Sequence, residues 1–186
     1  TLGGGLNHFD TKSGRAQRFQ HIDDDATSLI DDQVTDIKYD AAGRLWVATM
    51  GGLSRLDPTK NSFVNYAVQA NGLQAASISL LVDGDLLWVG TWGAGAYLLD
   101  LSQPQNLEPN QAVWLQYKNN PDTPNSINDN SIWSIHKSAS GLLWFGTQGG
   151  LSRYDPQSAQ FKAYTEKDGL RNTTILGILE DDNAYL

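Results

Sequence analysis

The chain has 186 residues, of which 40% are hydrophobic, enough to bury a core as one folded domain. Its 13 Lys and Arg residues against 21 Asp and Glu give a net charge of −8, so most of its surface would repel a phosphate backbone or an anionic membrane. We therefore expect no nucleic acid and no membrane contact for this segment. The sequence has no Cys, which excludes disulfides, thiolate catalysis and Cys-based zinc sites but fits either redox compartment.

The sequence shows no sign of a membrane span or a leader. No apolar run reaches the roughly 18–20 residues that cross a bilayer. Thr1 does not open a basic-then-apolar signal segment. We expect a soluble segment cut from a longer protein.

One motif occurs three times along the chain and marks a repeat. The motif Leu-Trp-Val/Phe-Ala/Gly-Thr stands at 45–49, 87–91 and 143–147, and each copy is followed by glycines and then by an Asp. Its tryptophans are 42 and 56 residues apart. Repeats of roughly 40–50 residues built from short strands are typical of propeller blades.

Each repeat predicts four strands, which we letter a to d. Strand a has apolar alternation with period two, strand b is the Leu-Trp segment, strand c follows the glycines, and strand d follows the turn after the Asp. Gly and Asp stand where these turns need positive φ or a side-chain cap. The predicted strands a, c and d are 34–39, 53–57 and 63–66, then 78–82, 96–100 and 112–117, then 132–136, 151–155 and 161–164.

The two ends of the chain fit the same frame. Residues 4–10 and 15–20 predict strands c and d, whereas 174–181 predicts a strand a and 185–186 the start of a strand b. The fold class is therefore all-β, with β-propeller blades of four antiparallel strands. Three complete blades (34–76, 77–130 and 131–173) lie between two half blades (1–33 and 174–186). The halves either close a four-bladed ring or belong to an arc of a larger ring, and we favour the arc.

The connections between strands differ in length from blade to blade. The second complete blade has a long c–d turn, 101–111, and a long d–a connection, 118–130, each with two prolines. Such turn-rich insertions are surface loops that vary for binding. The d–a connections alternate between two kinds, because 28–34 aligns with 126–132 whereas 71–73 aligns with 168–170.

The repeats resemble those of the two-component regulator propeller family. The matching features are the Leu-Trp-Val-Gly/Ala-Thr strand, Gly-Gly-Leu-Ser-Arg-Leu/Tyr-Asp-Pro, Phe-x-x-Tyr, and Asp-Gly-Leu before the next strand a. The resemblance implies a periplasmic, usually seven-bladed sensor propeller that precedes a membrane span and a histidine kinase or diguanylate cyclase. Such sensors detect small molecules or oligosaccharides. The segment departs from the pattern at 93–97, where Gly-Ala-Gly-Ala-Tyr alters one b–c turn.

The candidate ligand contacts lie on the face that b–c turns share with d–a connections. The residue after the motif Thr varies, as Met50, Trp92 and Gln148. Trp92 leads the set, because an exposed indole beside glycines can stack on a sugar ring. Burial of Trp92 against a neighbouring blade is the alternative. Asn130 and Asn172, in two d–a connections, complete the set.

The other tryptophans have structural interpretations. Trp46, Trp88 and Trp144 recur once per blade, which indicates apolar wedges between neighbouring sheets. Trp133 lies in a strand a, where it either lines the central channel or packs.

No catalytic, metal or cofactor site is expected in this segment. Asp57, Asp100 and Asp155 recur at one turn and so serve the fold. The acidic stretches 23–25 and 31–32 lack the spaced Asp-x-Asp-x-Asp-Gly loop of a calcium site. Neither zinc nor a catalytic triad is supported by the spacing of the three histidines, which are His8, His21 and His136.

Three functions remain open from the sequence. The first is a non-catalytic sensory module that recognises an oligosaccharide or another small molecule. The second is a polysaccharide lyase or glycosidase whose acid and base would come from Asp122, Asp129, Glu166 or Asp168. The third is a protein-interaction scaffold with open strand edges, which would also make the segment self-associate.

Overall fold

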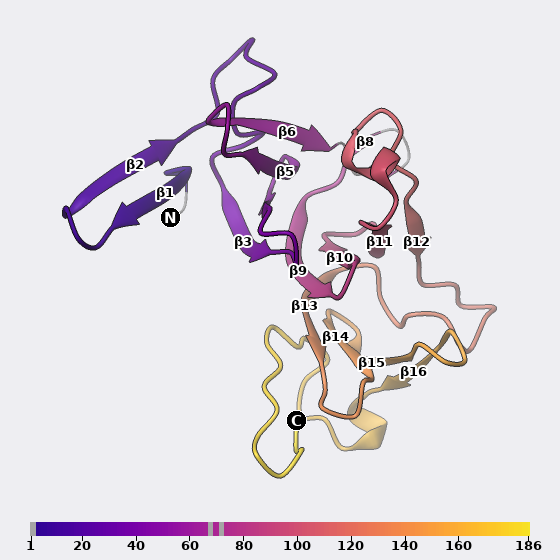
Figure 1. Ribbon diagram of the computed structural model, residues 1–186. Coiled ribbons are helices and arrows are strands. Elements are labelled where there is room, and N and C mark those ends of the chain that lie inside the picture. The colour runs from indigo at the N-terminus through magenta and orange to yellow at the C-terminus, as the bar shows by residue number, and fades with distance from the viewer. Residues whose placement is uncertain (1–2, 67–68, 71–72) are drawn as a thin grey trace. The chain divides into compact units, whose positions relative to one another are not determined.

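The computed structural model describes residues 3–66, 69–70 and 73–186, which form antiparallel sheets and two short 3-10 helices (Figure 1). The chain divides into two compact units, Thr1–Ser77 and Ile78–Leu186. None of the helices in the described part of the chain is long and apolar enough to cross a membrane.

The first unit contains a hairpin and a four-stranded sheet. The hairpin strands β1 and β2 are the expected strands c and d of a half blade, and the sheet, ordered β3-β4-β5-β6, is the first complete blade. A small two-stranded sheet, β7–β8, lies in the d–a connection that follows; Asn71 and Gly72 of that connection fall outside the described residues. The bounds are Leu6–Asp10 (β1), Arg15–Phe19 (β2), Val34–Tyr39 (β3), Leu45–Thr49 (β4), Gly52–Asp57 (β5), Ser62–Tyr66 (β6), Gln69–Ala70 (β7) and Leu73–Gln74 (β8).

The second unit contains two four-stranded antiparallel sheets. Their orders are β12-β11-β10-β9 and β13-β14-β15-β16, so each chain segment pairs with the one before it, as in a propeller blade. Strand β9 begins at the last residue of the first unit. The bounds are Ser77–Asp83 (β9), Leu86–Thr91 (β10), Ala96–Asp100 (β11), Leu115–Tyr117 (β12), Ile132–Lys137 (β13), Leu143–Thr147 (β14), Gly150–Asp155 (β15) and Gln160–Tyr164 (β16), with 3-10 helices Pro104–Leu107 (η1) and Glu166–Asp168 (η2). The all-β blade architecture predicted from the sequence is confirmed.

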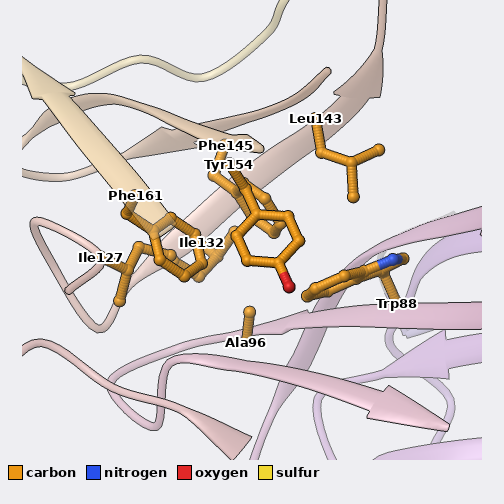
Figure 2. Close-up of a cluster of buried hydrophobic side chains, with 8 residues drawn as sticks. All are labelled: Trp88, Ala96, Ile127, Ile132, Leu143, Phe145, Tyr154 and Phe161. Carbon is orange, nitrogen blue, oxygen red and sulfur yellow. The ribbon is translucent and has the colours of Figure 1, made fainter. Parts of the chain in front are cut away.

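Apolar side chains fill the space between neighbouring sheets within each unit. In the first unit the hairpin meets the sheet through buried Leu6, Leu29, Leu45, Val47 and Phe63. Figure 2 shows the cluster between the two sheets of the second unit. Trp88 and Ala96 of the β9–β12 sheet face three aromatic side chains of the β13–β16 sheet, which are Phe145, Tyr154 and Phe161. Each buried side chain of this size stabilises the fold by about 1.5–3 kcal/mol.

Each motif tryptophan packs on the tyrosine that ends strand d of its own blade. The pairs are Trp46–Tyr66, Trp88–Tyr117 and Trp144–Tyr164, with ring centroids 5.2, 5.2 and 5.7 Å apart. Trp46 and Trp88 are fully buried, and Trp144 is partly buried. The Trp-to-Tyr contact thus ties the second strand of a blade to its fourth, across strand c.

The long d–a connections fasten onto the outer strand of the blade that follows them. The backbone N–H of Phe63 in β6 donates to the carbonyl of Thr27 at 2.7 Å, and that of Phe161 in β16 donates to the carbonyl of Asn125 at 3.0 Å. The connections that follow β6 and β16 instead hold the short β7–β8 pair and η2. The alternation seen in the sequence therefore reflects two kinds of connection, one of which clasps the next blade.

The expectation of strand a over 174–181 is wrong as to secondary structure, because no strand forms among residues 173–186. The segment nevertheless occupies the place of a strand a, since the backbone N–H of Ile175 donates to the carbonyl of Thr147 at 2.9 Å. A strand requires a ladder of backbone hydrogen bonds with a neighbour. No strand b lies beside this segment in the described part of the chain, and 185–186 also remains outside any strand.

Strand d of the second complete blade is shorter than the expected 112–117. Only Leu115–Tyr117 pairs with β11. The reason lies in the inserted c–d turn, where the buried side chain of Asn106 accepts a hydrogen bond from the Val113 backbone N–H at 2.9 Å and donates to the carbonyl of Asp100. This amide draws residue 113 toward η1 and away from the sheet.

Candidate ligand-contact surface

The b–c turns are built on the motif threonine. In each turn the buried threonine hydroxyl donates to the carbonyl of the glycine that opens strand c. The pairs are Thr49–Gly52, Thr91–Gly95 and Thr147–Gly150, at 3.0, 2.6 and 2.9 Å. The hydroxyl therefore closes the turn, and the residues between threonine and glycine form its tip.

One of the three tips is longer than the others. Two residues separate the threonine from the glycine in the first and third complete blades, whereas Trp92, Gly93 and Ala94 separate them in the second. Ala94 is buried, and Trp92 is 55% exposed. The altered turn predicted from residues 93–97 is thus a one-residue insertion. Trp92 is not buried, although its ring packs on the neighbouring blade, as the alternative to ligand contact supposed.

Trp92 has an aromatic neighbour from the next blade of the same unit. Its ring centroid lies 5.9 Å from that of Trp133, with the planes tilted by 50°. Trp133 stands at the bulge where the register of β13 on β14 shifts, between Ile132 and Ser134. The indole N–H of Trp133 has no hydrogen-bond acceptor among the described residues. The two indoles thus pack on each other, and the N–H of Trp133 is buried from solvent.

The positions equivalent to Trp92 have a similar backbone but different exposure. The N–H of Met50 donates to the carbonyl of Gln33, and that of Gln148 donates to the carbonyl of Ser131, both at 3.1 Å. Each acceptor stands just before strand a of the same blade. Met50, in the first unit, is partly buried, whereas Gln148 is exposed in the second unit, which also holds Trp92.

The two asparagines of the candidate set use their side-chain oxygens within the loops. Asn130 accepts a hydrogen bond from the Asn119 N–H at 2.8 Å, as Asp32 accepts one from the His21 N–H at 2.7 Å. Asn172 accepts one from Thr174 two residues later, which is an Asx turn. Sequence reasoning placed both residues on the right loops but did not detect these local roles.

The aspartates at the c–d turns serve the fold, as the sequence predicted. Asp57 accepts hydrogen bonds from the hydroxyl and the backbone N–H of Thr59, and Asp100 does the same with Ser102. Asp155 accepts one from the Gln157 N–H. The hydroxyl of Thr59 is the main reason why the pKa of Asp57 is lowered to about 2. Its charged form is the one that holds the turn.

One buried carboxylate was missed by the sequence reasoning. Asp40, in the a–b turn of the first complete blade, accepts hydrogen bonds from the Trp46 indole at 2.9 Å and from the Arg44 guanidinium at 2.6 Å. Burial alone would raise the pKa of Asp40, but the hydrogen bonds from Trp46 and Arg44 outweigh it and lower the pKa. The equivalent residue in the third complete blade is Ser138, which bonds within its own turn instead. A signal was available in the spacing Asp-x5-Trp, which occurs in one of the three repeats.

The carboxylates considered for an enzyme have local partners or lie on loops. Asp129 accepts a hydrogen bond from the Ser131 N–H, and Asp168 accepts one from the Thr165 N–H in the capping box of η2. Asp122 and Glu166 are exposed. Within the described ranges, no three His, Asp or Glu side chains gather closely enough to share a metal ion.

A known family of repeats matches two segments of this chain. The model of the two-component regulator propeller matches residues 28–51 and 126–149, each of which runs from a clasping d–a connection through strands a and b. The chain carries two-component regulator propeller repeats. No curated protein matches the sequence.

Solved structures place the regulator-propeller repeats among known propellers. An extracellular domain of a one component system from B. thetaiotaomicron is 22% identical with a TM-score of 0.74, over 98% of this chain and 23% of that one. An extracellular domain of a hybrid two component system from the same organism is 19% identical with a TM-score of 0.69, over 99% and 29%. Virginiamycin B lyase from Staphylococcus aureus is 12% identical with a TM-score of 0.66, over 98% and 55%. The regulator-propeller chain spans less than a third of the length of the two extracellular domains.

Proposed function

We propose that this chain is a non-catalytic, extracytoplasmic sensory segment of a signal-transduction receptor, and that it contacts an oligosaccharide or another small ring-shaped ligand through Trp92. The regulator-propeller repeats support the receptor role. The two similar structures from B. thetaiotaomicron are extracellular domains, which supports a periplasmic location. Signal output would come from a kinase or cyclase elsewhere in the receptor.

The observation that carries the ligand proposal is the exposed Trp92 on a turn with one inserted residue. An exposed indole is costly to leave in water, and its flat face offers contact area with few rotatable bonds. Trp133 beside it extends the apolar surface, which suits a ligand with a flat apolar face. A pyranose ring has such a face.

The experiment measures binding of the labelled chain to a glycan array, followed by titration of any bound glycan with tryptophan fluorescence as the readout. Trp92→Ala should weaken binding by about tenfold or more, which corresponds to about 1.4 kcal/mol. Tyr39→Ala is the matched control, because Tyr39 is also an exposed aromatic residue but belongs to strand β3 and not to a b–c turn. Equal affinity of Trp92→Ala and the wild type would refute the role of Trp92.

A second measurement separates the sensor from the enzyme. Any bound glycan is incubated with the chain and assayed for new reducing ends and for unsaturated products. We expect neither, since the candidate carboxylates Asp129 and Asp168 are occupied in loop hydrogen bonds. Turnover that Asp122→Asn or Glu166→Gln abolishes would establish the lyase or glycosidase alternative instead.

A further inference from the structure

One connection between blades holds two b–c turns of the second unit. The Gly95 N–H donates to the carbonyl of Asn130 at 2.8 Å, and the Gln148 N–H donates to the carbonyl of Ser131 at 3.1 Å. The two acceptors are consecutive residues just before β13. Because consecutive Cα atoms are about 3.8 Å apart, the two donor nitrogens lie within about 12 Å of each other. The tips of the two turns therefore border one surface, with Trp92 on one tip and Gln148 on the other.

The second tip carries two polar side chains with unused hydrogen-bonding capacity. Gln148 is exposed, and its amide has no hydrogen-bond partner among the described residues. Asp129 uses one carboxylate oxygen, Oδ1, to accept a hydrogen bond from the Ser131 N–H at 2.7 Å. Its other oxygen, Oδ2, lies 3.4 Å from the place that a Cβ on Gly149 would take, so it stands beside the turn that Gln148 opens.

The amide of Gln148 is not needed to build its turn. In the first complete blade the equivalent aspartate, Asp31, also lies against the turn and accepts a hydrogen bond from the Gln33 N–H. The tip residue there is Met50, which has no amide, yet the backbone of that turn is bonded in the same way. Asp129 thus shares a structural role with Asp31, whereas the side chain of Gln148 is free for a contact outside the chain.

The chemistry of this pair matches neighbouring hydroxyl groups. An amide both donates and accepts hydrogen bonds, whereas an ionised carboxylate only accepts them. Sugar hydroxyls do both, so two neighbouring hydroxyls can bind the Gln148 amide and donate to Asp129. A sulfate or carboxylate in place of these hydroxyls would be repelled by the charge of Asp129. A few polar groups beside an aromatic surface are what fixes the orientation of a small ligand.

We propose that Gln148 and Asp129 determine which saccharide binds, by binding free neighbouring hydroxyl groups of a glycan whose apolar ring face packs on Trp92. The proposal rests on the ligand contact proposed for Trp92 and adds the selectivity of that site. Glycans that carry a sulfate or an acid at these hydroxyls are excluded.

The test titrates uncharged oligosaccharides of glucose, galactose, mannose or xylose into the chain, with tryptophan fluorescence as the readout. Gln148→Met should weaken binding by about fivefold or more, and Asp129→Asn by about tenfold. Both turns should survive, because Met50 shows that methionine fits this position and asparagine keeps an oxygen for the Ser131 N–H. Gln157→Met is the matched control, since Gln157 is exposed but lies in the c–d turn at the other end of β15.

Monodeoxy analogues of the oligosaccharide that binds most tightly show whether the contact is direct. Removal of the hydroxyl that meets Gln148 should weaken binding to the wild type but not to Gln148→Met, because the variant has already lost that hydrogen bond. Circular dichroism melts of each variant check that the fold is unchanged.

The outcomes separate this proposal from the one for Trp92. If Trp92→Ala weakens binding while Gln148→Met and Asp129→Asn bind as the wild type does, the selectivity proposal is overturned and the contact at Trp92 stands. Equal affinity of Trp92→Ala and the wild type, or a wild type that binds none of the oligosaccharides, would overturn both.

Discussion

At the scale of single residues, polar side chains in this protein hold turns by using their charged or hydroxyl groups locally. Asp57 is the clearest case, because its carboxylate binds the hydroxyl and the N–H of Thr59. The sequence identified this aspartate correctly, since it recurs at the same place in every repeat. It did not identify Asp40, whose contact with Trp46 depends on how deeply the a–b turn is buried.

The turn at Asp57 predicts a pH dependence. Because the folded pKa is lowered from 3.8 to about 2, the charged carboxylate stabilises the fold above about pH 4, and that contribution is lost as the pH falls toward 2. Asp57→Asn should therefore have a lower Tm than the wild type at pH 6, and the difference should close between pH 4 and 2. Thermal melts across this range measure it, with Asp122→Asn as the exposed control. A difference that stays constant with pH would contradict the assignment.

At the scale of elements, each b–c turn needs a glycine where strand c begins. Gly95 has φ of 84°, and a Cβ there would lie 2.1 Å from the carbonyl oxygen of Tyr117. Gly93, at the tip of the same turn, also has positive φ, but a Cβ there would meet open space. Replacement by alanine should therefore destabilise the fold more at Gly95 than at Gly93, although the two glycines look alike in the sequence.

Substitution of these two glycines tests that difference. Gly93→Ala should lower stability by about 1 kcal/mol, the cost of an alanine at positive φ. Gly95→Ala should cost more, about 3 kcal/mol or above, because the end of β12 must also move. Urea unfolding of both variants gives the two values. Equal losses would mean that the contact with Tyr117 does not constrain the turn.

At the scale of the whole molecule, two clusters of buried side chains each lie within one unit. One cluster joins the β1–β2 hairpin to the first complete blade, and another joins the two blades of the second unit (Figure 2). In repeat proteins stability is close to a sum of units and their interfaces with neighbours. A substitution that disrupts one cluster should therefore lower the stability of the unit that contains it more than that of the other unit.

Phe145→Ala tests this division. The change removes a fully buried ring of the second cluster and should cost about 3–5 kcal/mol. Hydrogen exchange should speed up most for the amides of β9–β16, and Phe63→Ala should do the same for β3–β6. Uniform acceleration over both units in either variant would show that the chain unfolds as one cooperative body.

The sequence by itself determined the blades, because the Leu-Trp-Val-Gly-Thr motif and the period-two alternation record local strand and turn preferences that repeat in every unit. It could not decide whether 174–181 pairs as a strand, since hydrogen-bond ladders depend on which neighbour is present. Nor could it decide the exposure of Trp92. The turn that carries Trp92 has one added residue, and it is closed by the hydrogen bond from the buried Thr91 hydroxyl to the Gly95 carbonyl. The same holds for an apolar groove of about 510 Å³ in the first unit, which is lined by residues from all five strands β1 to β5.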